Sequence, residues 1–451
     1  MNQQVQFARL GLFDAKVPRY TSYPTAPHFS TSVQSKLHRQ WLGEITPGSS
    51  VSMYLHIPFC KRLCWFCACR TQGVQSDKPV KSYLDTLQDE IRLVADTLPK
   101  DVTLSRLHWG GGTPTILLPA DIIALAETIE KYLPLTETAE FSVEIDPSEV
   151  DEARLDAFAA VGMNRASIGV QDFDPKIQKS IGRMQSYDTT LKTAEMLRAR
   201  GIHSLNMDVL YGLPYQDTES VTNTTNQVIA VGPDRVALYG YAHVPWMARR
   251  QTMIPEDHLP DGPARLELSA CARGLFENAG YEAVGIDHFA RPEDGLAQAL
   301  KSGTLRRNFQ GYTEDTSEVL IGVGASAISR FPQGYVQNIA ATAAYLRQIR
   351  EGSLATARGH GFLSCDPMRG RVIEELMCQF TVDLDTLKQE IGARVYDLKP
   401  EFQRTHKKFL EFTTLDGNTL TILQQGRPLT RLIAREFDAY SIDAAGHSMA
   451  I

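Results

Sequence analysis

Four of the seven cysteines fall within ten residues, in the segment HIPFCKRLCWFCACR at 56–70. Cys60, Cys64 and Cys67 are spaced C-x3-C-x2-C, and Cys69 follows after one further residue. Thiolates are the usual ligands of iron–sulfur clusters, so three cysteines in one loop can hold three irons of a [4Fe–4S] cluster. The fourth iron would then be open to a small chelating molecule. The amino and carboxylate groups of S-adenosylmethionine suit such a site, where one electron splits the sulfonium into methionine and a 5′-deoxyadenosyl radical.

Three other uses of these cysteines have to be weighed. Structural zinc sites usually combine two separated ligand pairs, and the sequence has no second pair. A redox dithiol at Cys64 and Cys67 calls for a thioredoxin-like context, which four clustered cysteines fit poorly. A cluster with Cys69 as fourth ligand is the strongest rival, although one intervening residue makes it hard for Cys67 and Cys69 to reach different irons. We therefore assign the cluster to the first three cysteines and a separate role to Cys69.

Further polar groups stand on or just beyond predicted strands. Three glycines in GGGTPT at 110–115 let the backbone approach a ligand closely, and we expect free N–H groups there to suit a carboxylate. Carboxylates, an amide and a guanidinium on successive strands could bind the ribose hydroxyls and the amino-acid end of the cofactor. The alternative is a structural ion pair for each, because an unpaired buried charge is costly. These groups are Glu144, Gln171, Arg183 and Asp208.

The elements that position these residues alternate between strand and helix from about residue 50 to 290. Helical segments carry apolar residues at three- and four-residue spacing. Such alternation predicts right-handed crossovers and a parallel sheet, here an α/β fold with a partial (β/α)6 TIM-like barrel whose active site lies at the carboxyl ends of the strands. Strands are predicted at 51–58, 105–112, 140–146, 164–170, 204–212 and 235–242, and the stretch 281–290 can add another.

Three regions are predicted: an N-terminal arm at 1–50, a catalytic domain at 51–355, and a small, mainly helical C-terminal domain with a β wing at 356–451. The C-terminal region shows helical patterns at 371–380, 385–392 and 431–441. Between them, FTTLDGNTLTIL predicts a hairpin that turns at Asp416-Gly417. GVGASA at 322–327 matches a dinucleotide-binding pattern but opens no βαβ unit, so we reject that function.

The bulk composition is that of a folded enzyme, with 451 residues, 43% hydrophobic and 22% charged. A net charge of −7 gives no reason to expect nucleic-acid binding. No apolar run approaches the roughly 20 residues of a membrane span, and the first residues lack the pattern of a secretory signal. We therefore expect a cytoplasmic protein with no membrane partner. The three scattered cysteines are expected to be buried free thiols.

With these motifs assembled, the chain resembles the oxygen-independent coproporphyrinogen III oxidase family, radical-SAM dehydrogenases of haem biosynthesis. The resemblance runs from about residue 17 to the carboxyl end. It is carried by RYTSYPTA (19–26), YLHIPFCKRLCWFCAC (54–69), HWGGGTPT (108–115), EIDP (144–147), GVQDF (169–173), DVLYGLP (208–214), DHFARP (287–292), NFQGYT (308–313) and GVGASAIS (322–329). The arm, Cys69 and NFQGYT narrow the resemblance from the radical-SAM superfamily to this family.

This resemblance implies oxidative decarboxylation of two propionates of coproporphyrinogen III to vinyl groups, giving protoporphyrinogen IX. It implies a [4Fe–4S] cluster, two S-adenosylmethionine molecules, a flavodoxin- or ferredoxin-type electron donor, an unknown electron acceptor, and a monomer. Carried over by motif, the cluster-bound cofactor molecule is served by Tyr54, Gly111, Gly112, Thr113, Glu144 and Arg183. Both cofactor sites are lined by Gln171, Asp208, Leu210, Ala242 and Ile328, and catalytic roles fall to Tyr54, Cys69 and Arg19.

Coproporphyrinogen carries four carboxylates while the chain is acidic, so the substrate site must be locally basic. Arg19, Arg291, Arg306 and Arg307 lie in or beside family motifs and are the predicted propionate partners.

The sequence departs from the usual family pattern at Ala68, Arg70 and Ser148. Alanine at position 68 would strain the loop if that position needs a positive φ. Two related classes are the alternatives, a haem-binding chaperone and a radical-SAM methyltransferase that acts on haem. Both lack the Cys67-x-Cys69 pair that is present here, and the chaperone also lacks the N-terminal arm.

Overall fold

The centre of the molecule is a twelve-stranded sheet, seen in a computed structural model that describes residues 3–440 and 449–450. Six of its strands are neighbours in chain order, and each pairs in parallel with the next. They are β1 (Ser50–Ile57), β4 (Thr103–Gly111), β5 (Leu135–Ile145), β6 (Arg165–Gln171), β7 (Ser204–Tyr211) and β8 (Arg235–Gly240). The predicted partial (β/α)6 barrel is therefore confirmed.

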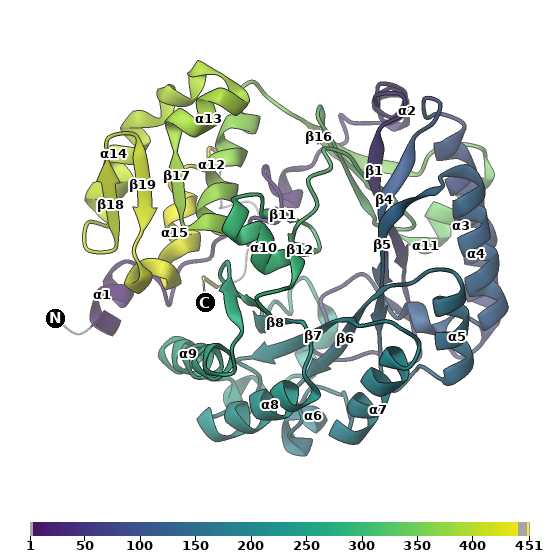
Figure 1. The fold of residues 1–451 in the computed structure, drawn as a ribbon, viewed down its shortest axis with the longest axis horizontal. Helices are drawn as coiled ribbons and strands as arrows, with labels where there is room; N and C mark the ends of the chain where they lie inside the picture. Colours follow the sequence, from purple (N-terminus) through teal and green to yellow (C-terminus); the bar gives the residue numbers. More distant parts are fainter. Residues whose placement is uncertain (1–2, 441–448, 451) are drawn as a thin grey trace.

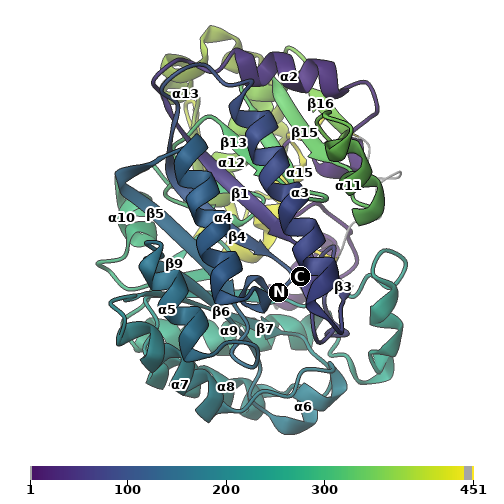
Figure 2. The ribbon, with the colours of Figure 1, turned by 90° about the vertical axis from the view of Figure 1, so that its right-hand side faces the viewer.

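Helices between these strands cover the outer face of the barrel (Figure 2). They are α3 (Asp77–Ala95), α4 (Pro119–Tyr132), α5 (Glu152–Ala160), α6 (Pro175–Ser180), α7 (Tyr187–Arg198) and α8 (Thr218–Val231). Four of them begin where the sequence supplies a capping side chain, which accepts a hydrogen bond from the amide of the third helical residue. These caps are Asp151, Asp174, Ser186 and Asp217. Helix α8 ends at Gly232 in the left-handed conformation, as its terminal glycine predicts. The short α6 was not predicted.

Antiparallel strands extend the barrel sheet on both sides. The stretch 281–290 forms two short strands rather than one, β9 (Glu282–Val284) and β10 (His288–Ala290), because Gly285 turns the chain with φ 57°. On the other side, β13 (Leu320–Val323) pairs in parallel with β1, and β14 (Ile328–Phe331), β15 (Gly334–Asn338) and β16 (Thr356–Gly361) follow as antiparallel neighbours. GVGASA is thus the turn between β13 and β14, and no helix begins there.

Charged side chains fill the barrel near the amino ends of its strands. Glu140 on β5 lies between Arg106 (2.9 Å) and Arg165 (3.1 Å). Glu314 similarly pairs with Arg106 and with Arg235 at the start of β8, both at 3.1 Å. This network closes one end of the barrel, so that the space for a ligand lies toward the carboxyl ends of the strands.

The C-terminal region packs beside the barrel as a second group of elements (Figure 1). It contains α12 (Asp366–Gln379), α13 (Leu384–Ile391), α14 (Lys399–Lys408), α15 (Thr430–Arg435) and a sheet of β17 (Thr381–Asp383), β18 (Thr413–Asp416) and β19 (Thr419–Ile422). The predicted hairpin at Asp416-Gly417 is confirmed. The helix predicted at 431–441 stops at Arg435, and position 441 lies outside the described residues.

The N-terminal arm divides its contacts between both groups. Helix α1 (Gln3–Arg9) and the extended residues after it pack with the C-terminal elements, and Phe7, Leu12 and Tyr20 share one buried apolar cluster with them. Helix α2 (Ser35–Gly43) packs on the barrel instead, through Trp41 and Leu42. Since β16 belongs to the barrel sheet, we propose that the catalytic domain extends to about Gly361 rather than 355.

The remaining elements are β2 (Phe59–Cys60), β3 (Gln72–Gly73), α9 (Gly262–Asn278), α10 (Gly295–Ser302), β11 (Arg306–Asn308), β12 (Gly311–Thr313) and α11 (Thr342–Arg350). None of the seven cysteines, all of which the structure describes, forms a disulfide. Of the three scattered ones only Cys378 is buried as expected, whereas Cys271 and Cys365 are partly exposed. Among the described residues, no helix combines the length and the hydropathy that crossing a membrane requires.

Candidate active site

The loop after β1 carries the four clustered cysteines and is fixed at its base. There β2 and β3 pair in parallel, with Phe59 opposite Gln72 and Cys60 opposite Gly73. Thr113 Oγ1 donates to Cys60 Sγ at 3.5 Å. Arg183 Nη1 donates to the buried Cys64 Sγ at 3.6 Å. Two of the predicted cofactor residues therefore touch two of the predicted cluster ligands.

The thiols of this loop suit iron–sulfur ligation. A hydrogen bond from Cys69 lowers the pKa of Cys67, with Arg250 adding positive charge nearby, and this favours the thiolate that binds metal. Burial raises the pKa of Cys60 to about 11, and the bond from Thr113 offsets part of that rise. Across the described residues, no three His, Cys, Asp or Glu side chains converge as ligands of a single metal ion. The triad fits a cluster better, because each thiolate binds a separate iron.

The glycine turn after β4 packs against the cysteine loop, which differs from what the sequence suggested. The Gly111 amide donates to Glu144 Oε2 (3.0 Å), that of Gly112 to the Ile57 carbonyl (2.8 Å), and that of Thr113 to the Phe59 carbonyl (2.8 Å). The prediction of free N–H groups is therefore wrong at these three positions, because each N–H is already bonded within the protein. A side chain at Gly112 would place its Cβ 2.6 Å from the Phe59 oxygen. This glycine is needed for close backbone packing under the cysteine loop.

Glu144 stands at the carboxyl end of β5 with its side chain 39% exposed. His108 Nε2 donates to it at 3.4 Å, and the His108 ring stacks on Tyr54 with centroids 5.7 Å apart. Burial alone would raise the pKa of Glu144, but the bonds from His108 and Gly111 outweigh it and hold the pKa below its usual value. Glu144 is therefore an ionised acceptor that faces the open barrel.

His56 links Tyr54 to the end of the cysteine loop. Its Nε2 donates to the Arg70 carbonyl at 2.9 Å, and burial lowers its pKa. Since neutral imidazole has one donor and one acceptor, Nδ1 accepts from the Tyr54 hydroxyl at 3.0 Å. Ala68 is not among the residues with positive φ, so the departure from the family glycine causes no strain there.

Arg183 is buried and bound mainly by protein partners. Its Nη1 lies 3.3 Å from Asp146 Oδ2, and its Nη2 donates to the Gly169 carbonyl (2.9 Å) and to Gln185 Oε1 (3.0 Å). Next to it, Gln171 has φ 70° where the pairing of β6 with β7 shifts register. The structural ion pair expected as the alternative for Arg183 is thus present, alongside its contact with Cys64.

Asp208 lies on β7 with its carboxylate held by neighbours. Asn206 Nδ2 donates to it at 2.8 Å and Ser167 Oγ at 3.2 Å. Burial, followed by the charge of Glu144, raises its pKa to about 6. The two carboxylates therefore give the barrel interior an acidic character.

The three apolar residues carried over by motif come from three different segments of the chain. Leu210 is buried in a small cluster with Ile181 and Tyr241. The Ala242 carbonyl accepts from Gln251 Nε2 at 3.0 Å, and Ala242 borders a large cavity. Ile328 begins β14 on the far side of β13.

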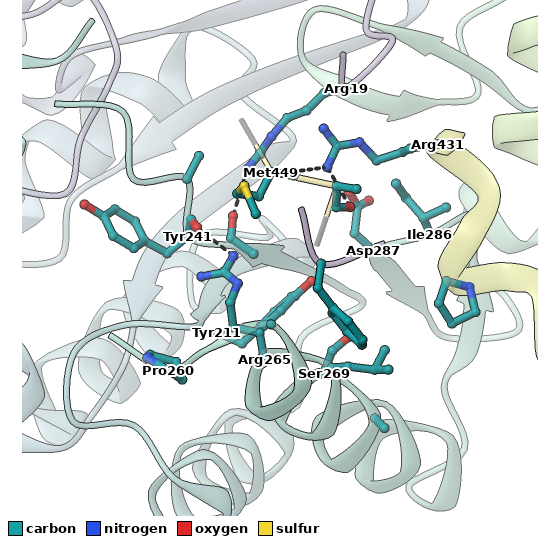
Figure 3. A pocket seen from close by; sticks show the side chains of 18 of the residues that line it. Arg19, Tyr211, Tyr241, Pro260, Arg265, Ser269, Ile286, Asp287, Arg431 and Met449 are labelled. Carbon is teal, nitrogen blue, oxygen red and sulfur yellow. Dashed lines mark hydrogen bonds between the residues drawn. The ribbon is translucent and has the colours of Figure 1, made fainter. Parts of the chain in front are cut away.

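That cavity has a volume of about 680 Å³ and lies at the carboxyl ends of β7 and β8, between the arm, α9 and the C-terminal elements (Figure 3). Arg19 Nη2 donates to the Gly240 carbonyl at 2.8 Å, and Arg307 Nη2 donates to the Arg19 carbonyl at 3.3 Å. The structure places Arg291 and Arg306 elsewhere: Arg291 stacks on Tyr281 at 4.1 Å, and Arg306 lies 3.8 Å from a carboxylate of α12, Glu375. Two of the four predicted arginines therefore meet at one site.

Four further arginines line the cavity and were missed from the sequence: Arg265, Arg273, Arg427 and Arg431. Arg265 on α9 donates to the Tyr241 carbonyl at 2.7 Å, and Arg431 on α15 donates to the Pro18 carbonyl at 3.1 Å. Neither stands in a recognisable motif. The one signal was the apolar surroundings of Arg431 in RLIAREF, where a charge needs polar partners.

Comparison with known proteins identifies the family of the chain. The family model of the Radical SAM superfamily matches residues 54–226. The oxygen-independent coproporphyrinogen III oxidase of Paracoccus denitrificans is 56% identical over 452 residues, covering 100% of each chain. That of Pseudomonas aeruginosa is 37% identical and covers 95% of this chain and 94% of its own. The chain belongs to the oxygen-independent coproporphyrinogen III oxidase family.

The fold places it in this family as well. A solved coproporphyrinogen III oxidase from Escherichia coli, described as a radical SAM enzyme, superimposes with a TM-score of 0.90 at 34% identity, covering 95% of this chain and 100% of its own. Oxygen-independent coproporphyrinogen III oxidases are oxidoreductases whose cofactors are a [4Fe–4S] cluster and S-adenosylmethionine. The cysteine loop beside Thr113 and Arg183 has the donor set for that cluster.

Proposed function

We propose that this protein converts coproporphyrinogen III to protoporphyrinogen IX by oxidative decarboxylation of two propionates, as a step of haem biosynthesis. The observation that carries the proposal is an arginine-lined cavity at the same end of the barrel as the cysteine loop. Its volume lies within the roughly 300–1,000 Å³ of small-molecule sites. Its walls also include apolar side chains that suit a macrocycle, among them Phe13, Trp246, Leu266 and Ile286.

On the cofactor side, Cys60, Cys64 and Cys67 hold the cluster, and Cys69 keeps its separate role. When bound, the cluster and S-adenosylmethionine supply the one-electron chemistry that removes a hydrogen atom from a substrate carbon. Glu144 and Asp208 offer ionised acceptors to the hydroxyl and amino groups of the cofactor. The family resemblance indicates two S-adenosylmethionine molecules, with Ala242 and Ile328 nearer the second.

On the substrate side, each propionate that reacts loses a hydrogen atom, one electron and CO₂. Positive charge beside that carboxylate opposes the loss, because it stabilises the ion that must disappear. The barrel interior provides the opposite environment, since Glu144 and Asp208 face it and the arginines line the cavity instead. The chain thus separates a cationic binding region from an acidic reacting region.

We further propose a cytoplasmic monomer that receives electrons from a flavodoxin- or ferredoxin-type protein. Lys61, 53% exposed, and the partly exposed Arg62 lie within the cysteine loop, between Cys60 and Cys64, and would face an acidic donor. The electron acceptor is not assigned.

The test is an anaerobic incubation of the reconstituted protein with coproporphyrinogen III, S-adenosylmethionine and a reductant, followed by chromatography of the tetrapyrroles. We expect monovinyl and divinyl products, with loss of CO₂. Binding of haem without vinyl products would instead identify a haem-binding chaperone. Methylation of haem would identify a methyltransferase.

A further inference from the structure

We propose that Arg19 and Arg307 hold a propionate that survives the reaction, so that the cavity fixes the end of the macrocycle that is not decarboxylated. The inference rests on the proposed function, because it takes coproporphyrinogen III as the ligand. It goes further by assigning which carboxylates the cationic region binds.

Six arginines line the cavity, and they differ in how their donors are used: Arg19, Arg265, Arg273, Arg307, Arg427 and Arg431. Arg431 gives its Nε to the Pro18 carbonyl and Nη1 to the carbonyls of Met449 and Ala450, and its Nη2 bonds to Val17. Arg265 donates to two backbone carbonyls, those of Gly212 and Tyr241. These two therefore contribute mainly positive charge.

Arg307 has two enclosed donor atoms without acceptors, whereas Arg427 has one and the other arginines of the cavity have none among the described residues. Arg307 is only 7% exposed, yet its Nε and Nη1 have no hydrogen-bond partner among the described residues. Its Nη2 reaches the Arg19 carbonyl, which places the two residues side by side. Both unused atoms are enclosed, so the guanidinium must turn slightly to meet a ligand. A carboxylate that enters between Arg19 and Arg307 supplies the acceptors that the protein does not.

The excess of positive charge in the cavity also favours binding of an anion. Over the part of the chain that the structure describes, no carboxylate lies within 4.0 Å of Arg19, Arg307 or Arg431 as an ion-pair partner. Asp287 lines the cavity, and burial alone would raise its pKa. The hydrogen bond with His288 Nδ1 (2.6 Å) and the charges of Arg307 and Arg19 instead lower that pKa. This one carboxylate therefore stands against two arginines. Burial and the repulsion of Arg19 and Arg307 lower the pKa of Arg431 to about 9. A bound carboxylate relieves this repulsion.

The same contacts decide which carboxylate is bound. If the propionate held by Arg307 left as CO₂, the buried guanidinium would again lack acceptors, and that state is unfavourable. A propionate that persists in the product keeps the contact before and after both decarboxylations. The reacting propionates then point toward the barrel interior, where Glu144 and Asp208 lie.

Affinities of two stable porphyrins test the assignment, measured by fluorescence quenching on the reconstituted holoenzyme without oxygen. Coproporphyrin III has four carboxylates, and protoporphyrin IX has the two that survive. We expect Arg307→Gln to weaken the binding of both by the same factor, at least about tenfold. Arg307→Lys keeps the charge without the planar fork, and we expect a smaller, again equal, loss.

Arg306→Gln is the matched control, because Arg306 neighbours Arg307 in sequence but does not line the cavity, and wild-type affinities are expected. A loss confined to coproporphyrin III would overturn the assignment, since Arg307 would then bind a reacting propionate. Equal affinity of wild type and Arg307→Gln for both porphyrins would also overturn it. If Arg307→Gln does not fold, Arg19→Gln must show the same equal loss. Absence of vinyl products from the wild type would refute the proposed function instead, so the two failures are distinguishable.

Discussion

Two glutamates on one strand are predicted to have different roles: Glu140 stabilises the fold, and Glu144 binds S-adenosylmethionine. Glu140 and Glu144 lie four residues apart on β5, so their side chains point to the same face. Burial alone would raise the pKa of Glu140, but Arg165 and Arg106 lower it to about 2. Relative to the ordinary value of 4.5, a shift of that size corresponds to roughly 3 kcal/mol of stability at neutral pH.

The pH dependence follows from the direction of the shift. Because the folded state lowers the pKa of Glu140, its contribution is present above about pH 4.5 and is lost as the pH falls toward about 2. We expect Glu140→Gln to lower the free energy of unfolding by roughly 3 kcal/mol at pH 7. The loss of stability between those two pH values should become shallower in the variant. Affinity for S-adenosylmethionine should stay at the wild-type level, because Glu140 lies in the closed end of the barrel.

Glu144→Gln is the matched partner. Glutamine keeps an oxygen that can accept from the Gly111 amide, so stability should change by less than about 1 kcal/mol. The charge-assisted hydrogen bond to the cofactor is lost. Such a bond contributes about 1.5–3 kcal/mol to binding, so the Kd for S-adenosylmethionine should rise about 10- to 150-fold. Urea unfolding gives the first quantity, and anaerobic titration calorimetry gives the second.

One pattern of results would refute this reasoning. If Glu144→Gln binds S-adenosylmethionine as the wild type does and loses as much stability as Glu140→Gln, Glu144 is a structural residue. The acidic interior would then be a feature of folding and not of the cofactor site.

Two further predictions concern the cluster and the second carboxylate. Replacing Cys60, Cys64 or Cys67 with Ser should abolish the iron content of anaerobically purified protein, whereas Cys69→Ser should retain about four iron per chain and lose turnover; loss of iron from that last variant would make Cys69 a ligand. Burial raises the pKa of Asp208 to about 6, so its ionisation costs stability as the pH rises from 3.8 to about 6. Asp208→Asn should therefore raise the melting temperature at pH 7 but not at pH 4, while weakening S-adenosylmethionine binding; equal melting temperatures at pH 7 would contradict the shifted pKa.

The parallel strands were predictable because each is a short stretch rich in apolar, β-branched or aromatic residues and alternates with helices of regular period. The C-terminal hairpin was predictable from Asp416-Gly417, whose glycine has φ 57°. The antiparallel strands β13 to β16 were not, because they are short and mostly joined by turns rather than helices. The division of 281–290 into two strands was not predicted, because it depends on a single glycine, Gly285, within an otherwise strand-like stretch.

The candidate site was predictable to the extent that it stands in local motifs. The cysteine loop, Glu144 and Asp208 each follow or end a strand, which places them at one end of the barrel. The cavity was not predictable, because it is built by segments far apart in the sequence, from Phe13 to Ala450. No local pattern shows that Arg265 and Arg431 join Arg19 there. The glycine turn was placed correctly, but its N–H groups proved to serve the protein's own packing.

The contact between the arm and the C-terminal elements sets an order of events during synthesis. The arm leaves the ribosome first, yet Leu12 and Tyr20 share a buried apolar cluster with residues of α12 and α15, which are made late. At roughly 5–20 residues per second, the arm waits on the order of 20–80 s for these partners. The barrel strands, including the cysteine loop, are complete well before that. Iron–sulfur assembly can therefore reach the loop before Arg19 is held in the cavity. The substrate site is completed only when α15 has emerged.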